Sequence, residues 1–163
     1  MGLIVTDTLL AVAPVGPARL AQITARAAAR PGMWLDLVRF DAARRWYRRL
    51  ALHDDHEVWL LSWLPGQETG FHDHGASSGA FTVALGTLRE RSGTGGFPDP
   101  SGRTLVRGSV RSFGPDYVHD VRNDSAEPAV SIHAYSPPLT SMRRFDVSDG
   151  GGLRLARVEV RSW

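Results

Sequence analysis

The segment GQETGFHDHGASSGAFTVALG, residues 66–86, contains two histidines, His72 and His74, separated by one residue. Side chains at positions i and i+2 of a β-strand lie on the same face of the sheet. Two imidazoles placed in this way can bind one metal ion if that face lines the interior of a barrel. A third candidate ligand, His119, lies in YVHDVRND, residues 117–124, another predicted strand. Three neutral imidazoles on one side of a metal would leave its other side open, as a catalytic metal requires.

The sequence around these histidines predicts a β-rich fold. From residue 56 onward, short runs of apolar and β-branched residues alternate with glycine, proline and aspartate. Runs of this kind are typical of an all-β sandwich or barrel. They are EVWLLSWL (57–64), AFTVALGTL (80–88), RTLVRGSV (103–110), AVSIHAY (129–135) and GLRLARVEV (152–160).

The N-terminal part of the chain has a different, helical character. Pro17 opens PARLAQITARAAAR, residues 17–30, which consists largely of strong helix formers and stops at a Pro-Gly pair. A second short helix is predicted over residues 41–49, with Asp41 as its cap. Because there is no internal repeat or linker, we expect a single domain over residues 1–163. It would comprise a helical cap at 1–50 and a small β-barrel at 51–163.

Composition excludes several classes of function. The 163 residues carry 19 basic and 17 acidic side chains, so the net charge of +2 is too small for a nucleic-acid-binding surface. There is no cysteine, which rules out disulfides and thiolate metal ligands. Residues 1–15 lack the basic start of a signal peptide and are interpreted as an N-terminal arm. No apolar run approaches the roughly 20 residues needed to cross a bilayer. We therefore predict a cytoplasmic protein that binds neither nucleic acid nor membrane; the sequence does not indicate its oligomeric state.

The residues that frame the histidines add a second line of argument. A glycine precedes His72 by six positions, and another follows His74 by twelve. Likewise a glycine precedes His119 by eleven positions, and an asparagine follows it by four. This spacing resembles the two motifs of the cupin superfamily, whose fold is a small β-barrel or jelly roll. The framing residues are Gly66, Gly86, Gly108 and Asn123.

The chain departs from the cupin pattern at three positions. Gly79 stands where the first motif usually has a glutamate, and Gly114 and Asp116 stand where the second usually has proline and glycine. The first departure removes the carboxylate that would be the fourth metal ligand. What remains is a site of three histidines.

Within cupins, a three-histidine site resembles that of the cysteine dioxygenase family of thiol dioxygenases. Two further segments resemble bacterial members: HDHG followed by Ser77, and SIHAYSPP at residues 131–138. In addition, Tyr47-Arg48-Arg49 resembles a Tyr-x-Arg motif that bacterial members have near the first barrel strand. The resemblance covers roughly residues 45–146.

The resemblance implies an Fe(II) enzyme that converts L-cysteine and O2 to cysteine sulfinic acid, with His72, His74 and His119 as the metal ligands. It also implies that Arg49, beside Tyr47, pairs with the substrate carboxylate, although Arg48 is the alternative. A bidentate, permanently charged guanidinium suits that task. Tyr135 would reach the bound substrate with its hydroxyl, and His133 would be hydrogen-bonded behind it. Positions 133 and 135 lie on one strand face, so both can point inward.

Other functions remain open at this point. A related enzyme could oxidise another small thiol acid, such as 3-mercaptopropionate. A non-catalytic ligand-binding cupin or a zinc or manganese isomerase would belong to a different class. Animal members of the family form a thioether between a tyrosine and a cysteine, but the matching position here is Gly79, so that crosslink cannot form. The Ser136-Pro137 bond can be cis or trans.

Overall fold

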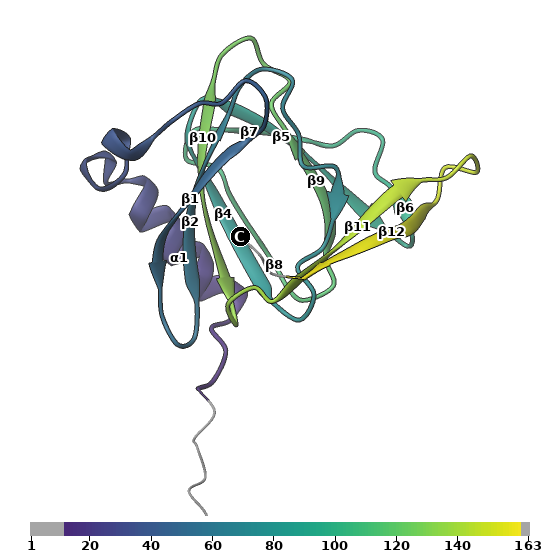
Figure 1. The fold of residues 1–163 in the computed structure, drawn as a ribbon, viewed down its shortest axis with the longest axis horizontal. Coiled ribbons are helices and arrows are strands. Elements are labelled where there is room, and N and C mark those ends of the chain that lie inside the picture. The colour runs from purple at the N-terminus through teal and green to yellow at the C-terminus, as the bar shows by residue number, and fades with distance from the viewer. Residues whose placement is uncertain (1–11, 161–163) are drawn as a thin grey trace, which may run out of the picture.

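The computed structural model describes residues 12–160 of the chain, so most of the predicted N-terminal arm lies outside the described residues. Figure 1 shows a curled arrangement of strands with a helical segment against its outer face. This confirms the prediction of an all-β barrel preceded by a short helical segment. The helical elements are α1 (Pro17–Ala28), η1 (Pro31–Met33) and η2 (Leu35–Leu37). The strands are β1 (Trp46–Leu52), β2 (Glu57–Trp63), β3 (Phe71–His72), β4 (Ser78–Leu85), β5 (Thr87–Thr94), β6 (Phe97–Pro98), β7 (Arg103–Val106), β8 (Val110–Phe113), β9 (Val118–Arg122), β10 (Ala129–Ser136), β11 (Ser141–Val147) and β12 (Leu153–Val160).

The strands form two antiparallel sheets. The five-stranded sheet has the order β1-β2-β10-β4-β8, and the seven-stranded sheet has the order β12-β11-β3-β9-β5-β6, with β7 also paired to β5. Strands that are distant in the sequence are therefore neighbours, as β2 and β10 are. The hairpin of β11 and β12 extends away from the barrel (Figure 1). Part of that hairpin nevertheless forms a wall of the site described below.

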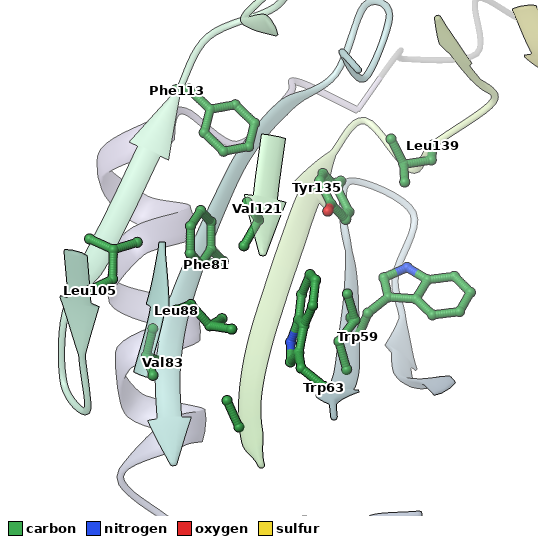
Figure 2. Packing of buried hydrophobic residues seen from close by; sticks show 12 residues of the cluster. Trp59, Trp63, Phe81, Val83, Leu88, Leu105, Phe113, Val121, Tyr135 and Leu139 are labelled. Atoms are coloured by element: carbon green, nitrogen blue, oxygen red, sulfur yellow. The ribbon is translucent and has the colours of Figure 1, made fainter. Parts of the chain in front are cut away.

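The alternation of side chains along β2 and β10 separates two apolar clusters. On β10, Val130, Ile132 and Ala134 face outward and pack with the helix residue Leu20. The intervening residues face the barrel interior, where Trp63 and other large side chains form the main cluster (Figure 2). Because successive residues of a strand point to opposite faces, Ser131, His133 and Tyr135 share the interior face. The outer face of β10 thus packs against the helical segment, and its inner face carries the polar side chains Ser131, His133 and Tyr135.

The helix α1 begins at Pro17 as predicted and ends two residues before the predicted end at residue 30. Pro17 occupies its first turn, and the helix stops at Ala28, shortly before Pro31. Leu20 is fully buried against the five-stranded sheet, and Trp34 closes the same cluster. Burial of a large apolar side chain stabilises the fold by about 1.5–3 kcal/mol, so this contact ties the helical segment to the outside of the barrel.

The helix predicted over residues 41–49 is wrong. This segment is a bend followed by β1, which starts at Trp46 and pairs with β2 from Trp46↔Ser62 onward. The arginines and alanines of the segment favour a helix locally, but pairing with a neighbouring strand outweighs that preference. The strand also crosses the predicted boundary between cap and barrel at residues 50 and 51. The division into one domain with these two parts stays a prediction.

Two features of the structure explain why position 86 is a glycine. It connects β4 to β5 with a φ of +74°, in the left-handed region that glycine adopts without strain. A Cβ built there would lie 2.6 Å from the carbonyl oxygen of Pro128, so the close approach of the two chain segments also excludes a side chain. Among the described residues, no helix is long and apolar enough to span a membrane.

Candidate metal centre

The three predicted ligands converge at one point on the inner wall of the barrel. His72 of β3 and His119 of β9 are register partners, so strand pairing brings together two residues that are far apart in the sequence. His74 follows two residues after His72, beyond the end of β3. One ligand atom from each ring lies within 4.8 Å of the others, and all three side chains are buried. The predicted cluster is therefore present, although the strand that carries the first pair ends at His72.

The hydrogen bonds of the rings indicate which nitrogen faces the centre. Nδ1 of His72 lies 2.9 Å from the carbonyl oxygen of Gly70, and Nδ1 of His119 lies 2.9 Å from Oε1 of Glu90. In both rings Nε2 is then left for a metal, because the outer partner determines the tautomer. Nδ1 of His74 is buried and has no hydrogen-bond partner among the described residues. Its ring is held instead between Phe113 and Tyr135.

Electrostatics keep two of these donors neutral. Burial, followed by the proximity of the other histidines, lowers the pKa of His72 and of His74 well below 6.5. A metal ligand must be unprotonated, so both rings are ready to bind at neutral pH. Burial alone would raise the pKa of Glu90, but its hydrogen bonds with His119 and Arg111 lower it overall. The Glu90 carboxylate is thus hydrogen-bonded to one of the three candidate ligands, His119.

The side chain of Asp73, between His72 and His74, is held by hydrogen bonds outside the cavity. Its side chain is fully buried and accepts a hydrogen bond from Nε of Arg143 at 2.6 Å and one from the backbone N–H of Gly75 at 3.0 Å. These contacts hold the segment that continues from β3. Asp73 is absent from the cavity lining described below.

The position of the missing fourth ligand is filled by an aromatic ring. A Cβ built at Gly79 would lie 2.4 Å from Cε2 of Phe113 and 3.1 Å from Cδ1 of Tyr135. Neither a glutamate nor a cysteine fits there unless both rings move. The three-histidine character therefore follows from packing around the site as well as from the absence of the carboxylate.

The three histidines open onto a cavity of about 150 Å³. Two arginines contribute to its wall, Arg45 ahead of β1 and Arg144 of β11. Arg144 is engaged: its Nε donates to Glu159 at 3.0 Å and its Nη1 to the carbonyl oxygen of Thr69 at 3.1 Å. The lining residues are Arg45, Tyr47, Trp59, Leu61, Thr69, His72, His74, His119, Val121, His133, Tyr135, Leu139, Met142, Arg144 and Glu159.

Arg45 differs from Arg144 in having no carboxylate partner among the described residues. Its Nε is buried without a hydrogen-bond partner in the described part of the chain, and its guanidinium lies 4.8 Å from the centre of the Trp63 ring. Burial lowers the pKa of Arg45 to about 10, so the group is still charged at neutral pH. A buried cation without a counter-ion is costly, which makes Arg45 a ready partner for an anionic ligand.

Of the two residues predicted to bind the substrate, Tyr47 lines the cavity and Arg49 does not. Tyr47 lines the cavity, is 46% exposed and contacts Trp59 edge to face. Arg49 is not a lining residue; its Nη1 lies 3.7 Å from the buried carboxylate of Glu57. Arg45 was not among the predicted site residues; it lies just ahead of β1, two residues before Tyr47.

Tyr135 and His133 both line the cavity, as the resemblance implied, and Nδ1 of His133 lies 3.2 Å from the Tyr135 hydroxyl. The Ser136-Pro137 bond that follows is cis. Ser131, which the sequence analysis did not assign, lies 2.8 Å from Nε2 of His133. The same i, i+2 spacing could have identified it. Glu90 could not have been found in this way, because it lies on another strand.

Comparisons with known proteins identify the family of this chain. A family model described as "Cysteine dioxygenase type I" matches residues 5–148. The protein named cysteine dioxygenase type 1 from Danio rerio is 31% identical over 134 residues, which cover 74% of this chain and 65% of that protein. Its Homo sapiens counterpart is 30% identical, with 74% and 64% covered. The chain thus spans slightly less than two thirds of the length of these relatives.

Solved structures support the fold. A conserved protein with a double-stranded β-helix domain from Klebsiella pneumoniae matches with a TM-score of 0.56 and 22% identity, covering 75% of this chain and 92% of that one. An RmlC-like cupin protein from Desulfovibrio desulfuricans matches with a TM-score of 0.53 and 21% identity, covering 63% and 91%. These likenesses confirm the predicted cupin fold. Together with the family match over most of the sequence, they lead to one conclusion: the chain belongs to the cysteine dioxygenase type I family.

Proposed function

We propose that this protein is a non-haem Fe(II) thiol dioxygenase that converts L-cysteine and O2 to cysteine sulfinic acid. The observation that carries the proposal is the convergence of three buried histidines on the wall of a small cavity. Sites for drug-sized ligands occupy roughly 300–1,000 Å³, so a cavity of about 150 Å³ suits a ligand of few atoms. Membership of the cysteine dioxygenase family supports the same reaction class.

His72, His74 and His119 would hold the iron through imidazole nitrogens, a donor type that suits divalent iron. Iron bound there would activate O2 and favour the thiolate form of the substrate, so that both oxygen atoms are transferred to one sulfur. Glu90 supports this set, since a carboxylate hydrogen-bonded to a ligating histidine raises the basicity of that ligand. The apolar wall, which includes Trp59 and Leu61, limits the access of water.

The substrate carboxylate would pair with Arg45. This role was predicted for Arg49, but Arg49 is engaged with Glu57, whereas the Nε–H of Arg45 is unpartnered among the described residues. A guanidinium and a carboxylate can form two parallel charge-assisted hydrogen bonds. Tyr47 would close the same side of the cavity, and Tyr135, with His133 behind it, would donate a hydrogen bond to the bound substrate.

3-Mercaptopropionate is the second candidate substrate. It carries the thiol and the carboxylate of cysteine but lacks the amine. Glu159 is the only acidic residue of the cavity wall in the described part of the chain, and it is already paired with Arg144 and Arg157. The protein groups therefore provide a partner for the carboxylate and none dedicated to the amine.

Oxygen uptake after anaerobic Fe(II) loading tests the proposal, with L-cysteine, 3-mercaptopropionate and cysteamine as substrates. Arg45→Gln should raise KM for cysteine about 10- to 100-fold, because a hydrogen-bonded charge contributes about 1.5–3 kcal/mol. Turnover of cysteamine, which has no carboxylate, should respond little to this change.

Arg48→Gln is the matched control, since Arg48 is an exposed arginine of β1, three residues after Arg45, and is not part of the cavity wall. Arg49→Gln provides the direct comparison with the sequence prediction. A large KM effect in Arg49→Gln and none in Arg45→Gln would return the role to Arg49. If no thiol stimulates oxygen uptake by the iron-loaded protein, the chain is a ligand-binding cupin instead.

A further inference from the structure

Four buried polar side chains form a continuous line along the inner face of β2 and β10. Nε1 of Trp63 donates to Oγ of Ser131 at 2.9 Å, and Oγ of Ser131 lies 2.8 Å from Nε2 of His133. Nδ1 of His133 in turn lies 3.2 Å from the hydroxyl of Tyr135. Trp63 and Tyr135 stand at the two ends of this line on the interior side of the sheet (Figure 2). The line therefore leads from the main apolar cluster to the cavity wall.

The chemistry of Trp63 determines the direction of the hydrogen bonds at Ser131. An indole N–H can only donate, so Ser131 must accept from Trp63. Ser131 is fully buried, and His133 is the only other hydrogen-bond partner that the described residues offer to its Oγ. Because a buried hydroxyl hydrogen needs an acceptor, Ser131 donates to Nε2 of His133. A proton on Nε2 would instead direct two donors at one oxygen and leave the serine hydrogen without an acceptor.

The same direction continues to Tyr135. Burial, and then the positive charge of Arg45, lower the pKa of His133 well below 6.5, so the ring carries one proton. With Nε2 accepting, that proton lies on Nδ1 and is donated to the tyrosine oxygen. The phenol hydrogen of Tyr135 is then left without a protein acceptor among the described residues. Since Tyr135 lines the cavity, its O–H points toward whatever binds there.

We propose that Trp63 is a positioning residue that sets the direction of this line and so makes the Tyr135 hydroxyl an obligatory donor to the bound ligand. Trp63 is not itself a cavity-lining residue, although its ring lies against the guanidinium of Arg45, a contact that Trp63→Phe keeps. Its indole N–H is connected to Tyr135 through Ser131 and His133. The consequence for turnover rests on the proposed function. The position of the proton on His133 does not, because it follows from hydrogen bonds within the protein.

Nitrogen-15 NMR of the full chain, loaded with diamagnetic Zn(II), tests the proton position directly. The shifts of Nδ1 and Nε2 distinguish the two neutral tautomers, and a His133→Asn sample assigns the signals. The wild-type protein should carry the His133 proton on Nδ1. Trp63→Phe keeps the ring and removes the donor, so a population with the proton on Nε2 should appear.

Trp59→Phe is the matched control for this measurement. Trp59 lies on the same strand and also faces the interior, but its Nε1 has no hydrogen-bond partner in the described part of the chain. Its replacement should leave the His133 tautomer unchanged. Ser131→Ala is the second variant, which breaks the line with a small change in volume, and it should weaken the Nδ1 preference as Trp63→Phe does.

The catalytic measurement follows on the iron-loaded protein. Trp63→Phe should lower kcat about five- to tenfold with little change in KM, as expected for the loss of one directed hydrogen bond. A wild-type His133 that carries its proton on Nε2 overturns the proposal, whatever the activity. So does an unchanged Nδ1 proton in both Trp63→Phe and Ser131→Ala. If the tautomer shifts as expected but the wild type oxidises no thiol, the proposed function fails and the positioning role stands.

Discussion

Two buried histidines of the same cavity, His119 and His133, are oriented by opposite means. His119 is held by a charged group: the Glu90 carboxylate accepts from its Nδ1 and is itself paired with Arg111. His133 has only uncharged hydrogen-bond partners in the described part of the chain, the hydroxyls of a serine and a tyrosine. Both rings belong to the cavity lining, yet only His119 belongs to the histidine cluster.

The charged partner of His119 and the uncharged partners of His133 have different chemical consequences. A negative charge behind a ligand raises its basicity and offsets part of the charge of a metal. Behind His133, a carboxylate would instead favour a protonated ring, and the ring could then no longer accept a hydrogen bond from Ser131. We infer that the charged arrangement suits metal binding and the neutral one suits a directed hydrogen bond. Three predictions test this comparison.

The largest effect is expected from removing the two histidines in turn. His119→Ala should lose iron and abolish turnover, because two imidazoles are too few to hold Fe(II) against water. His133→Ala should retain about one iron per chain while its turnover falls. Iron content after anaerobic loading and desalting, measured beside oxygen uptake, gives the answer. Near-normal iron in His119→Ala would exclude His119 as a ligand and make His133 the candidate.

A smaller effect is expected from neutralising the charge behind His119. Glu90→Gln keeps the shape and an acceptor oxygen but removes the negative charge, so Fe(II) affinity should fall about 10- to 100-fold. Competition with a chelator measures that affinity. Glu68→Gln is the control, since Glu68 forms an exposed ion pair with Arg122 on the barrel surface. Equal affinities for the Glu90 variant and the wild type would mean that the carboxylate only fills space.

The smallest effect concerns the stability of the metal-free protein as the pH falls. The pKa of His133 is lowered in the folded state, so the unfolded chain binds a proton first, below a pH of about 6.5. Stability contributed by the neutral ring is therefore present above that pH and is lost below it, by about 1.4 kcal/mol per pH unit.

Urea unfolding of the wild type and of His133→Asn between about pH 5 and pH 7.5 measures this contribution. Other groups titrate in both proteins, so the difference between the two slopes isolates His133. The variant should lose less stability per pH unit than the wild type. Parallel slopes would show that the folded state accepts a proton on His133 as readily as the unfolded chain does.

The sequence by itself determined the parts of this protein that depend on spacing along one strand. The pair His133 and Tyr135 follows an i, i+2 pattern within β10, and strand alternation places both on one face. The pair His72 and His74 has the same spacing, although β3 ends at His72. The histidines, together with the framing residues Gly66, Gly86, Gly108 and Asn123, indicated a cupin barrel. The third candidate ligand, His119, was also predicted, because the motif resemblance carries a spacing between strands that periodicity lacks.

Only the tertiary structure decided which groups stand opposite these residues. Glu90 reaches His119 from β5 through strand pairing, since Ser92 is the register partner of His119. Arg45, rather than Arg49, reaches the cavity because Arg49 is held by Glu57 of the neighbouring strand, close to a bulge in β1. Partners across strands depend on register and bulges, and these are set by the packing of the whole barrel. Local spacing therefore predicts which side chains face inward, while the assembled sheets select the ones that meet.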